Sequence, residues 1–138
     1  MTRLVRATTV GALGALAAFH VAWGRGSSFP FRDGDELADA VAGRRAVPPP
    51  SACFAVAGAL SVAATLVADV PRLPRHVQRI GVIGVAVVLA TRGALGFAGR
   101  TDVVSPGSAS ARFRRLDRRV YSPLCLALAA GALSSRRR

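Results

Sequence analysis

The chain has 138 residues, of which 51% are hydrophobic, and its mean hydropathy is +0.39 although 19% of the residues are charged. The formal net charge of +12 comes from 19 arginines and no lysine, and these arginines lie between long uncharged stretches rather than along a basic face interleaved with aromatic residues. This segregation excludes nucleic acid as the expected partner and is typical of a membrane protein whose charges flank apolar spans.

Four apolar runs organise the chain into one predicted membrane domain over residues 1–138. Three runs have 17, 18 and 19 residues without a polar stripe at helical period, close to the about 20 that a helix needs to cross about 30 Å of hydrocarbon. The fourth run is shorter, so a helix that spans the membrane there must also include residues on either side of it. The predicted class is all-α, a four-helix transmembrane bundle with spans over 7–23, 51–68, 80–98 and 116–135.

The first run follows Arg3 and Arg6 and ends in the letters HVAWG. A positive beginning, an apolar centre and the small residues Ala15 and Ala17 are also compatible with a cleaved signal peptide. We expect a retained span, because three further apolar runs follow.

The connections differ in kind. Residues 24–50 form a long connection in which 35–45 is predicted to be a short interfacial helix, with acids first and Arg44 and Arg45 last. Residues 70–79 are predicted to form a tight basic turn, and 99–119 a loop that ends in a block of arginines.

The fourth span has an unusual beginning. Asp117 is expected in its first turn, as a cap of free N–H groups. Pro123 follows about two turns into the span, so the helix either kinks or begins near Ser122. We expect an irregular first turn that is buried against protein, because free backbone groups cannot face lipid.

Polar residues converge in one half of the predicted bundle, because successive spans alternate in direction. Arg92 is the most informative of them, since a charge inside a span is costly and usually has a partner, although a long side chain can also snorkel to the headgroups. Asp117 is its expected partner. The predicted polar cluster or ligand-binding site consists of His20, Trp23, Arg92, Asp117 and Tyr121.

Each of the other three cluster residues has a plainer interpretation. His20 is compatible with a hydrogen bond across helices, and Trp23 and Tyr121 with a belt at the membrane interface. Cys53 and Cys125 are expected to pack separately, without metal-ligand spacing. No metal, cofactor or catalytic residue is predicted. Comparable numbers of arginines fall on both sides of the predicted bundle, so the orientation of this multi-pass protein in the cell membrane stays open.

Three stretches resemble a known family. HVAW at the end of the first span, Arg92 in the third, and the pattern F-x-x-x-D-x-x-x-Y-S-P-L-C from Phe113 to Cys125 look like the DUF3995 family of small bacterial integral membrane proteins. The resemblance implies four spans and membrane residence, and no reaction. Many relatives carry an acid soon after the arginine, whereas this chain reads RGALGFAG, so Asp117 would be the sole partner of Arg92.

Three functions are compatible with the sequence. The first is a non-enzymatic protein that binds or moves a lipid or a small anionic molecule through the polar cluster. The second is a structural subunit whose cluster only orders the helices. The third is a small lipid-modifying enzyme with His20 and Asp117 as acid and base. The sequence leans against an enzyme, because it contains no nucleophile–base pair, metal spacing or phosphate loop.

Overall fold

The structure, a computed structural model, describes residues 2–69, 73–103, 105–108 and 110–134, excluding the side chain of Thr2. Within these residues the regular structure is entirely helical, as predicted. Four long helical segments make up most of the structure. Three are single α-helices, and the fourth consists of three consecutive helical elements without a break. The long elements are α1 (Thr2–Gly24), α3 (Pro50–Ala68), α4 (Arg75–Phe97), and α5 (Ala111–Leu116), η3 (Asp117–Tyr121) and α6 (Ser122–Ser134).

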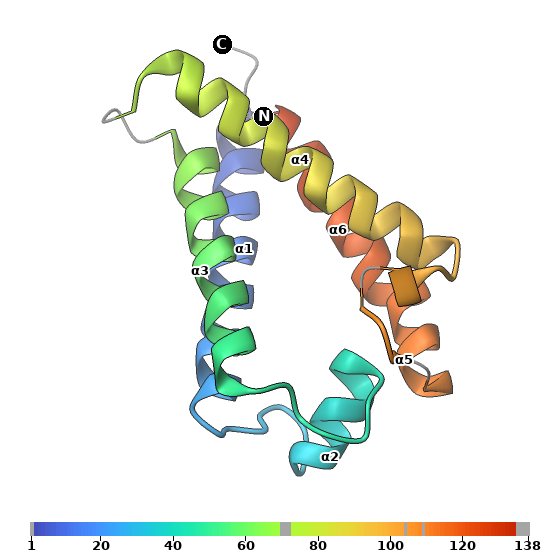
Figure 1. Cartoon of the computed structure of the whole chain (residues 1–138). Coiled ribbons are helices and arrows are strands. Elements are labelled where there is room, and N and C mark those ends of the chain that lie inside the picture. The colour runs from blue at the N-terminus through green and yellow to red at the C-terminus, as the bar shows by residue number, and fades with distance from the viewer. Residues whose placement is uncertain (1, 70–72, 104, 109, 135–138) are drawn as a thin grey trace.

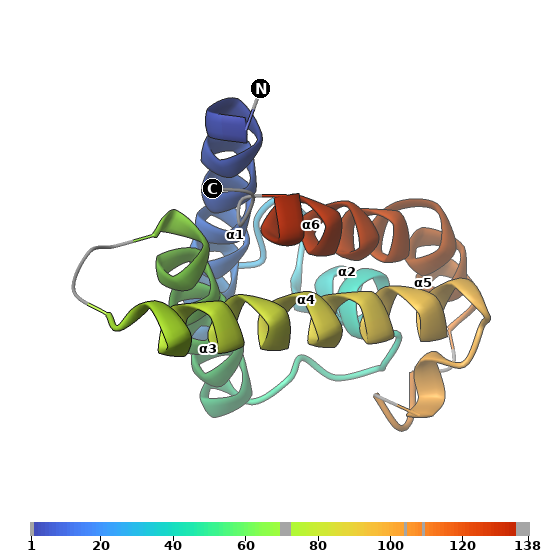
Figure 2. The same ribbon diagram turned by 90° about the horizontal axis from the view of Figure 1, so that it is seen from above.

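The long helices form two antiparallel pairs. α1 packs along α3, and α4 packs along α6, as the two views in Figures 1 and 2 show. The pairs touch near the start of α1 and the end of α6, and they diverge toward the opposite end of the molecule (Figure 1). The ends of α1 and α4 and the beginnings of α3 and α5 lie toward this second end, which α2 (Gly34–Leu37) also occupies.

The core is small and joins all four long segments. It consists mainly of alanine and β-branched or leucine side chains, which allow close packing, while many large apolar side chains face outward. Its buried members are Leu13, Ala63, Val67, Val82, Ala86, Leu128, Ala129 and Ala132. By length and composition α1, α3 and α4 are each suited to crossing a membrane, so the chain has the character of a membrane protein. The fourth crossing segment and the closed bundle stay predictions.

The predicted turn over residues 70–79 differs from the structure. α4 begins at Arg75, after Pro74, so residues 75–79 are helical instead of a turn, and Gln78 donates a hydrogen bond to the carbonyl of Leu66 at 3.0 Å. The rest of that predicted turn, residues 70–72, lies outside the described residues. A proline directly before the first helical turn suits a helix start, because the missing N–H would have no partner there.

The short interfacial helix forms, with shifted ends. It runs from Gly34 to Ala42 as α2 followed by the π-helical turn η1 (Ala38–Ala42). The carboxylate of Asp33 accepts a hydrogen bond from the backbone N–H of Glu36 at 2.8 Å and caps its start. The helix ends at Gly43, whose φ of +65° glycine adopts readily, so Arg44 and Arg45 lie beyond it rather than in its last turn.

The fourth helix begins at Ala111, five residues before the predicted start at 116. The Ser110 side chain accepts a hydrogen bond from the N–H of Phe113 at 3.0 Å, so serine is the cap and the arginine block is helical. Asp117 is therefore not a cap, which corrects the sequence prediction. The predicted end of the span at 135 lies outside the described residues.

The irregular turn expected near Pro123 is a π turn. The N–H of Ser122 bonds to the carbonyl of Asp117, five residues earlier, across η3. A proline inside a regular α-helix removes one hydrogen bond and its ring strikes the preceding turn, and a wider turn gives that ring room. The same turn brings residues five apart above one another, whereas a regular helix separates them by about 140°. Asp117 and Ser122 thus face the same side.

Glycine lets α4 and α6 approach closely. A Cβ added at Gly93 would lie 2.8 Å from Cγ of Leu126 and 2.9 Å from the carbonyl oxygen of Ser122. A Cβ added at Gly84, in the same helix, would meet nothing within 4 Å.

We therefore expect Gly93→Ala and Gly84→Ala to change stability in opposite directions. Gly93→Ala should lower the free energy of unfolding by about 1–3 kcal/mol, because the helices must separate. Gly84→Ala should raise it by about 0.5–1 kcal/mol through helix propensity. Unfolding in mixed detergent micelles measures both, and a stabilising Gly93→Ala would contradict the close packing.

Candidate functional site

A buried carboxylate lies where α4, η2 (Thr101–Val103) and the π turn meet. Asp117 is 1% exposed, and each of its oxygens accepts hydrogen bonds. Oδ1 accepts from Nη2 of Arg92 at 2.8 Å and from Oγ of Ser122 at 3.2 Å, and Oδ2 accepts from the hydroxyl of Thr101. The ion pair predicted between Arg92 and Asp117 is therefore present.

The pair forms a neutral unit inside the protein. A buried carboxylate without a partner is strongly destabilising. Here the arginine supplies the opposite charge, and the arginine and two hydroxyl groups donate hydrogen bonds to the carboxylate oxygens. Gly96 makes the room, because a Cβ there would lie 2.6 Å from Nη1 of Arg92 and 2.7 Å from Oδ2 of Asp117. Nη1 itself is buried and has no hydrogen-bond partner among the described residues.

His20 and Trp23 lie apart from this pair. Nδ1 of His20 donates to the carbonyl of Leu16 at 2.8 Å, and its ring contacts Trp23 with centroids 4.9 Å apart. Nε1 of Trp23 donates to the carbonyl of Phe29 at 2.8 Å. Over the part of the chain that the structure describes, no hydrogen bond or ion pair joins either residue to Arg92 or Asp117. The reason is that α1 pairs with α3, and the two helix pairs diverge at this end (Figure 1).

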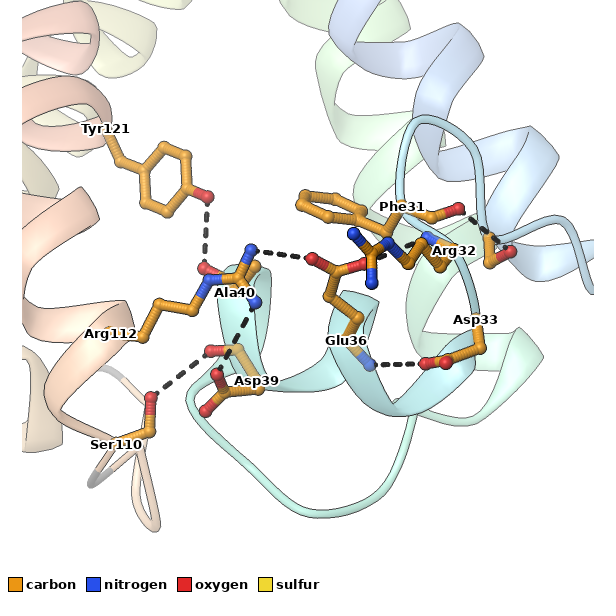
Figure 3. A network of polar contacts seen from close by, with 10 residues as sticks. Phe31, Arg32, Asp33, Glu36, Asp39, Ala40, Ser110, Arg112 and Tyr121 are labelled. Atoms are coloured by element: carbon orange, nitrogen blue, oxygen red, sulfur yellow. Dashed lines mark hydrogen bonds and ion pairs between the residues drawn. The ribbon is translucent and has the colours of Figure 1, made fainter.

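Tyr121 faces the short helix formed by α2 and η1 (residues 34–42), which we call the α2 segment. Its hydroxyl donates to the carbonyl of Ala40 at 3.0 Å (Figure 3). The predicted cluster is thus divided in the structure: Arg92 with Asp117, His20 with Trp23, and Tyr121 with η1. A shared role of the five residues in binding a ligand stays a prediction.

Further polar contacts hold the α2 segment against the fourth helix. Nη2 of Arg112 lies 2.9 Å from Oε1 of Glu36, and its Nη1 lies 4.0 Å from Asp39 (Figure 3). Ser110 donates to the carbonyl of Asp39 at 3.3 Å. We call these contacts, with that of Tyr121, the docking network.

Glu36 is ionised in this network at neutral pH. Its carboxylate accepts a hydrogen bond from the backbone N–H of Arg32 at 3.0 Å, and this bond, followed by that from Arg112, lowers the pKa of Glu36 below its usual value. The same contact with Glu36 raises the pKa of Arg112. The docking network therefore depends on a charged carboxylate.

A pocket of about 450 Å³ opens beside the buried pair. Thr101 and Asp117 form part of its wall, together with glycines of α4 and its exit and with four arginines of α5 and η3. We call it the arginine pocket, and its lining residues are Gly96, Gly99, Thr101, Arg114, Arg115, Asp117, Arg118 and Arg119.

The four arginine side chains of the pocket lie without an acidic partner in the described part of the chain. Among the described residues, none of them forms a side-chain hydrogen bond or an ion pair. Arg118 lies against the backbone of Gly99, where an added Cβ would meet its Nη2 at 2.9 Å. From the sequence these arginines are expected to be flanking charges, but their spacings of three and four residues on a helix also indicate a shared face.

A second hollow, of about 740 Å³, has a mixed character. Asp35 and Asp39 line it together with Arg44 and Arg45, and Arg44 already donates to the carbonyl of Pro106. The two negative charges of the aspartates equal the two positive charges of the arginines, so the lining of this hollow has no net charge. The arginine pocket is the better candidate site.

The comparisons with known proteins agree with the resemblance noted in the sequence. A family model described as "Protein of unknown function (DUF3995)" matches residues 13–132. No curated protein and no solved structure matches the chain. The matched range includes the buried pair and the arginine pocket, but its description names no activity.

The ion pair predicts a non-additive double-mutant cycle. Arg92→Gln and Asp117→Asn should each lower the free energy of unfolding by about 3–5 kcal/mol, because each leaves the other partner unsatisfied. The double variant should lose less than the sum, with a coupling of about 1–3 kcal/mol. Chemical unfolding of the purified protein in one detergent measures all three.

The exposed pair between Arg6 and Asp69, 3.3 Å apart at the opposite end, is the matched control. Arg6→Gln with Asp69→Asn should show a coupling of at most about 1 kcal/mol. Additive losses at Arg92 and Asp117 would contradict a stabilising contact between them.

The docking network predicts a pH dependence. Because folding lowers the pKa of Glu36, its contribution is present above the unfolded value of about 4.3 and is lost as the pH falls through the lower folded value. Glu36→Gln should therefore lower the unfolding temperature at pH 7, and this difference from wild type should shrink below about pH 4.

Thermal unfolding at a series of pH values measures this difference. Asp35→Asn is the control, since it removes an acid of the same segment that does not contact Arg112. A Glu36→Gln effect of equal size at pH 7 and pH 3 would contradict the role of the carboxylate charge.

Proposed function

The chain belongs to the DUF3995 family of proteins of unknown function, and from that premise we propose that it is a multi-pass protein of the bacterial cell membrane that binds a lipid or small molecule with an anionic group. The arginine pocket carries this proposal. The protein resides in the lipid bilayer, and the ligand binds in one half of that bilayer.

The proposal includes a fourth crossing segment. α6 has only 13 residues, but it continues η3 and α5 without a break, and residues 120–134 carry no charge. Residues 116–134 would extend about 28 Å as a helix, close to the thickness of the hydrocarbon layer. The exposed large apolar side chains of the long helices also favour a lipid environment over water.

The charge around the arginine pocket supports an anionic ligand. Four arginines are among its lining residues, and the one acid among them, Asp117, is already paired with Arg92. Like charges gathered on one face of a helix repel one another, so a bound anion would relieve this repulsion. Guanidinium groups also suit carboxylate and phosphate oxygens, with which they form paired hydrogen bonds.

A structural role is the second candidate, and the buried pair favours it. Both oxygens of Asp117 have partners from α4, η2 and α6, an arrangement that orders helices without a ligand. The enzyme hypothesis has less support, because no hydrogen bond joins His20 to Asp117 in the described part of the chain. One experiment separates binding from a purely structural role.

Native mass spectrometry of the full-length protein, purified in a mild detergent, should reveal a retained anionic lipid. Arg118→Gln with Arg119→Gln should remove most of it, because half of the pocket charge is lost. Arg75→Gln with Arg79→Gln, which changes two exposed arginines at the start of α4, is the matched control and should retain the lipid.

A wild-type protein that retains no anionic lipid, and whose unfolding temperature no added anionic lipid raises, would overturn the binding proposal. In that case a loss of folding in Arg92→Gln would leave the structural role as the function that the buried pair serves. Equal loss of lipid from the pocket variant and the control would also contradict a specific site.

A further inference from the structure

We infer that the group which the arginine pocket binds is a phosphate monoester, a terminal phosphate with two ionisable oxygens, carried by a membrane lipid. This inference rests on the proposed function and specifies the chemistry of its ligand. Its basis is the number of arginines that line the pocket and the residues that surround them.

The four arginines project from one side of their helix. Arg114 and Arg118, like Arg115 and Arg119, are four residues apart in the continuous helix of α5 and η3, a spacing that makes side chains neighbours on a helix surface. All four line the same pocket, and none has a side-chain partner among the residues that the structure describes. The pocket therefore concentrates four positive charges toward one volume of about 450 Å³.

The other residues that line the pocket do not cancel the charge of these arginines. Asp117 is the one acid among the lining residues, and it is held by Arg92 together with two hydroxyl groups. The other lining residues, Gly96, Gly99 and Thr101, are uncharged. A ligand in the pocket would consequently meet a net charge close to that of the four arginines.

This charge matches a monoester better than a diester. A phosphodiester carries one negative charge, whereas a phosphate monoester carries about 1.5 to 2 at pH 7 and presents three terminal oxygens as acceptors. Several guanidinium forks can bind three terminal oxygens in pairs of hydrogen bonds. With a diester, more of the guanidinium charge would remain uncompensated.

The surroundings of the pocket favour a lipid as the carrier of this phosphate. Phe97 is 57% exposed and follows the lining residue Gly96, and Val103 and Val120 are exposed close in sequence to Thr101 and Arg119. Phe97 ends α4, Val103 ends η2 and Val120 lies in the π turn, near the boundary of the predicted spans. Acyl chains could pack beside them while the phosphate enters the pocket.

Thermal unfolding of the full-length protein, with defined lipids added to its micelles, tests the inference. Dioleoyl phosphatidic acid should raise the unfolding temperature at a concentration at least about tenfold lower than dioleoyl phosphatidylglycerol, because its additional charge strengthens the attraction to the arginines. A tenfold difference corresponds to about 1.4 kcal/mol. Phosphatidylcholine should give no shift. The preference for phosphatidic acid should increase from pH 6 to pH 8, as the phosphate gains its second charge.

The pocket variant Arg118→Gln with Arg119→Gln should lose the preference, and the control Arg75→Gln with Arg79→Gln should keep it. Should the pocket variant fail to fold, the comparison of lipids on the wild-type protein still tests the inference. Inorganic phosphate and pyrophosphate form a further arm, and we expect them to compete only at millimolar concentrations.

The outcomes are distinct. Equal shifts with phosphatidic acid and phosphatidylglycerol would overturn the monoester while leaving an anion-binding protein. Inorganic phosphate as effective as phosphatidic acid would support the phosphate chemistry and overturn the lipid as its source. No shift with any anionic lipid or phosphate would overturn this inference and the proposed function together.

Discussion

The ion pair between Arg92 and Asp117 is the constraint on which the rest of this structure depends. A charge placed well inside an apolar helix needs a partner of opposite sign, and the 2.8 Å contact with Asp117 provides it. Several local features follow from this contact. Gly96 keeps the space free, Thr101 and Ser122 complete the bonds of the carboxylate, and the π turn directs Ser122 toward it. One electrostatic requirement thus fixes α4 against the π turn η3 of the fourth helix.

The two helix pairs are joined differently at their two ends. Near the start of α1, the helices meet through apolar packing in the core. At the other end they diverge, and the α2 segment bridges to the fourth helix through polar contacts of Glu36, Asp39 and Arg112. Exposed ion pairs contribute less to stability than apolar burial, so the polar end is the part of the molecule with the weaker internal contacts. The arginine pocket lies toward this end.

The buried pair and the arginine pocket share Asp117 but use charge in opposite ways. In the pair, charge is neutralised within the protein, which suits a structural role. In the pocket, four arginines remain without partners among the described residues, which suits an anion from outside. Because Arg92 already neutralises Asp117, the carboxylate in the pocket wall does not repel such an anion. The pair that orders the helices therefore also sets the charge of the neighbouring pocket.

The sequence by itself determined the all-helical class, three long apolar helices and the partnership of Arg92 with Asp117, and it predicted the short helix of the first connection with other ends. Hydropathy and helix caps act locally, and a charge inside a span needs the one acid that lies near it. Only the tertiary structure decided that His20 and Trp23 lie apart from that pair, and that four arginines surround a pocket. These features depend on which helices pack together and where the pairs diverge. Periodicity along one chain carries no information about that choice, since an apolar face fits several partners equally well.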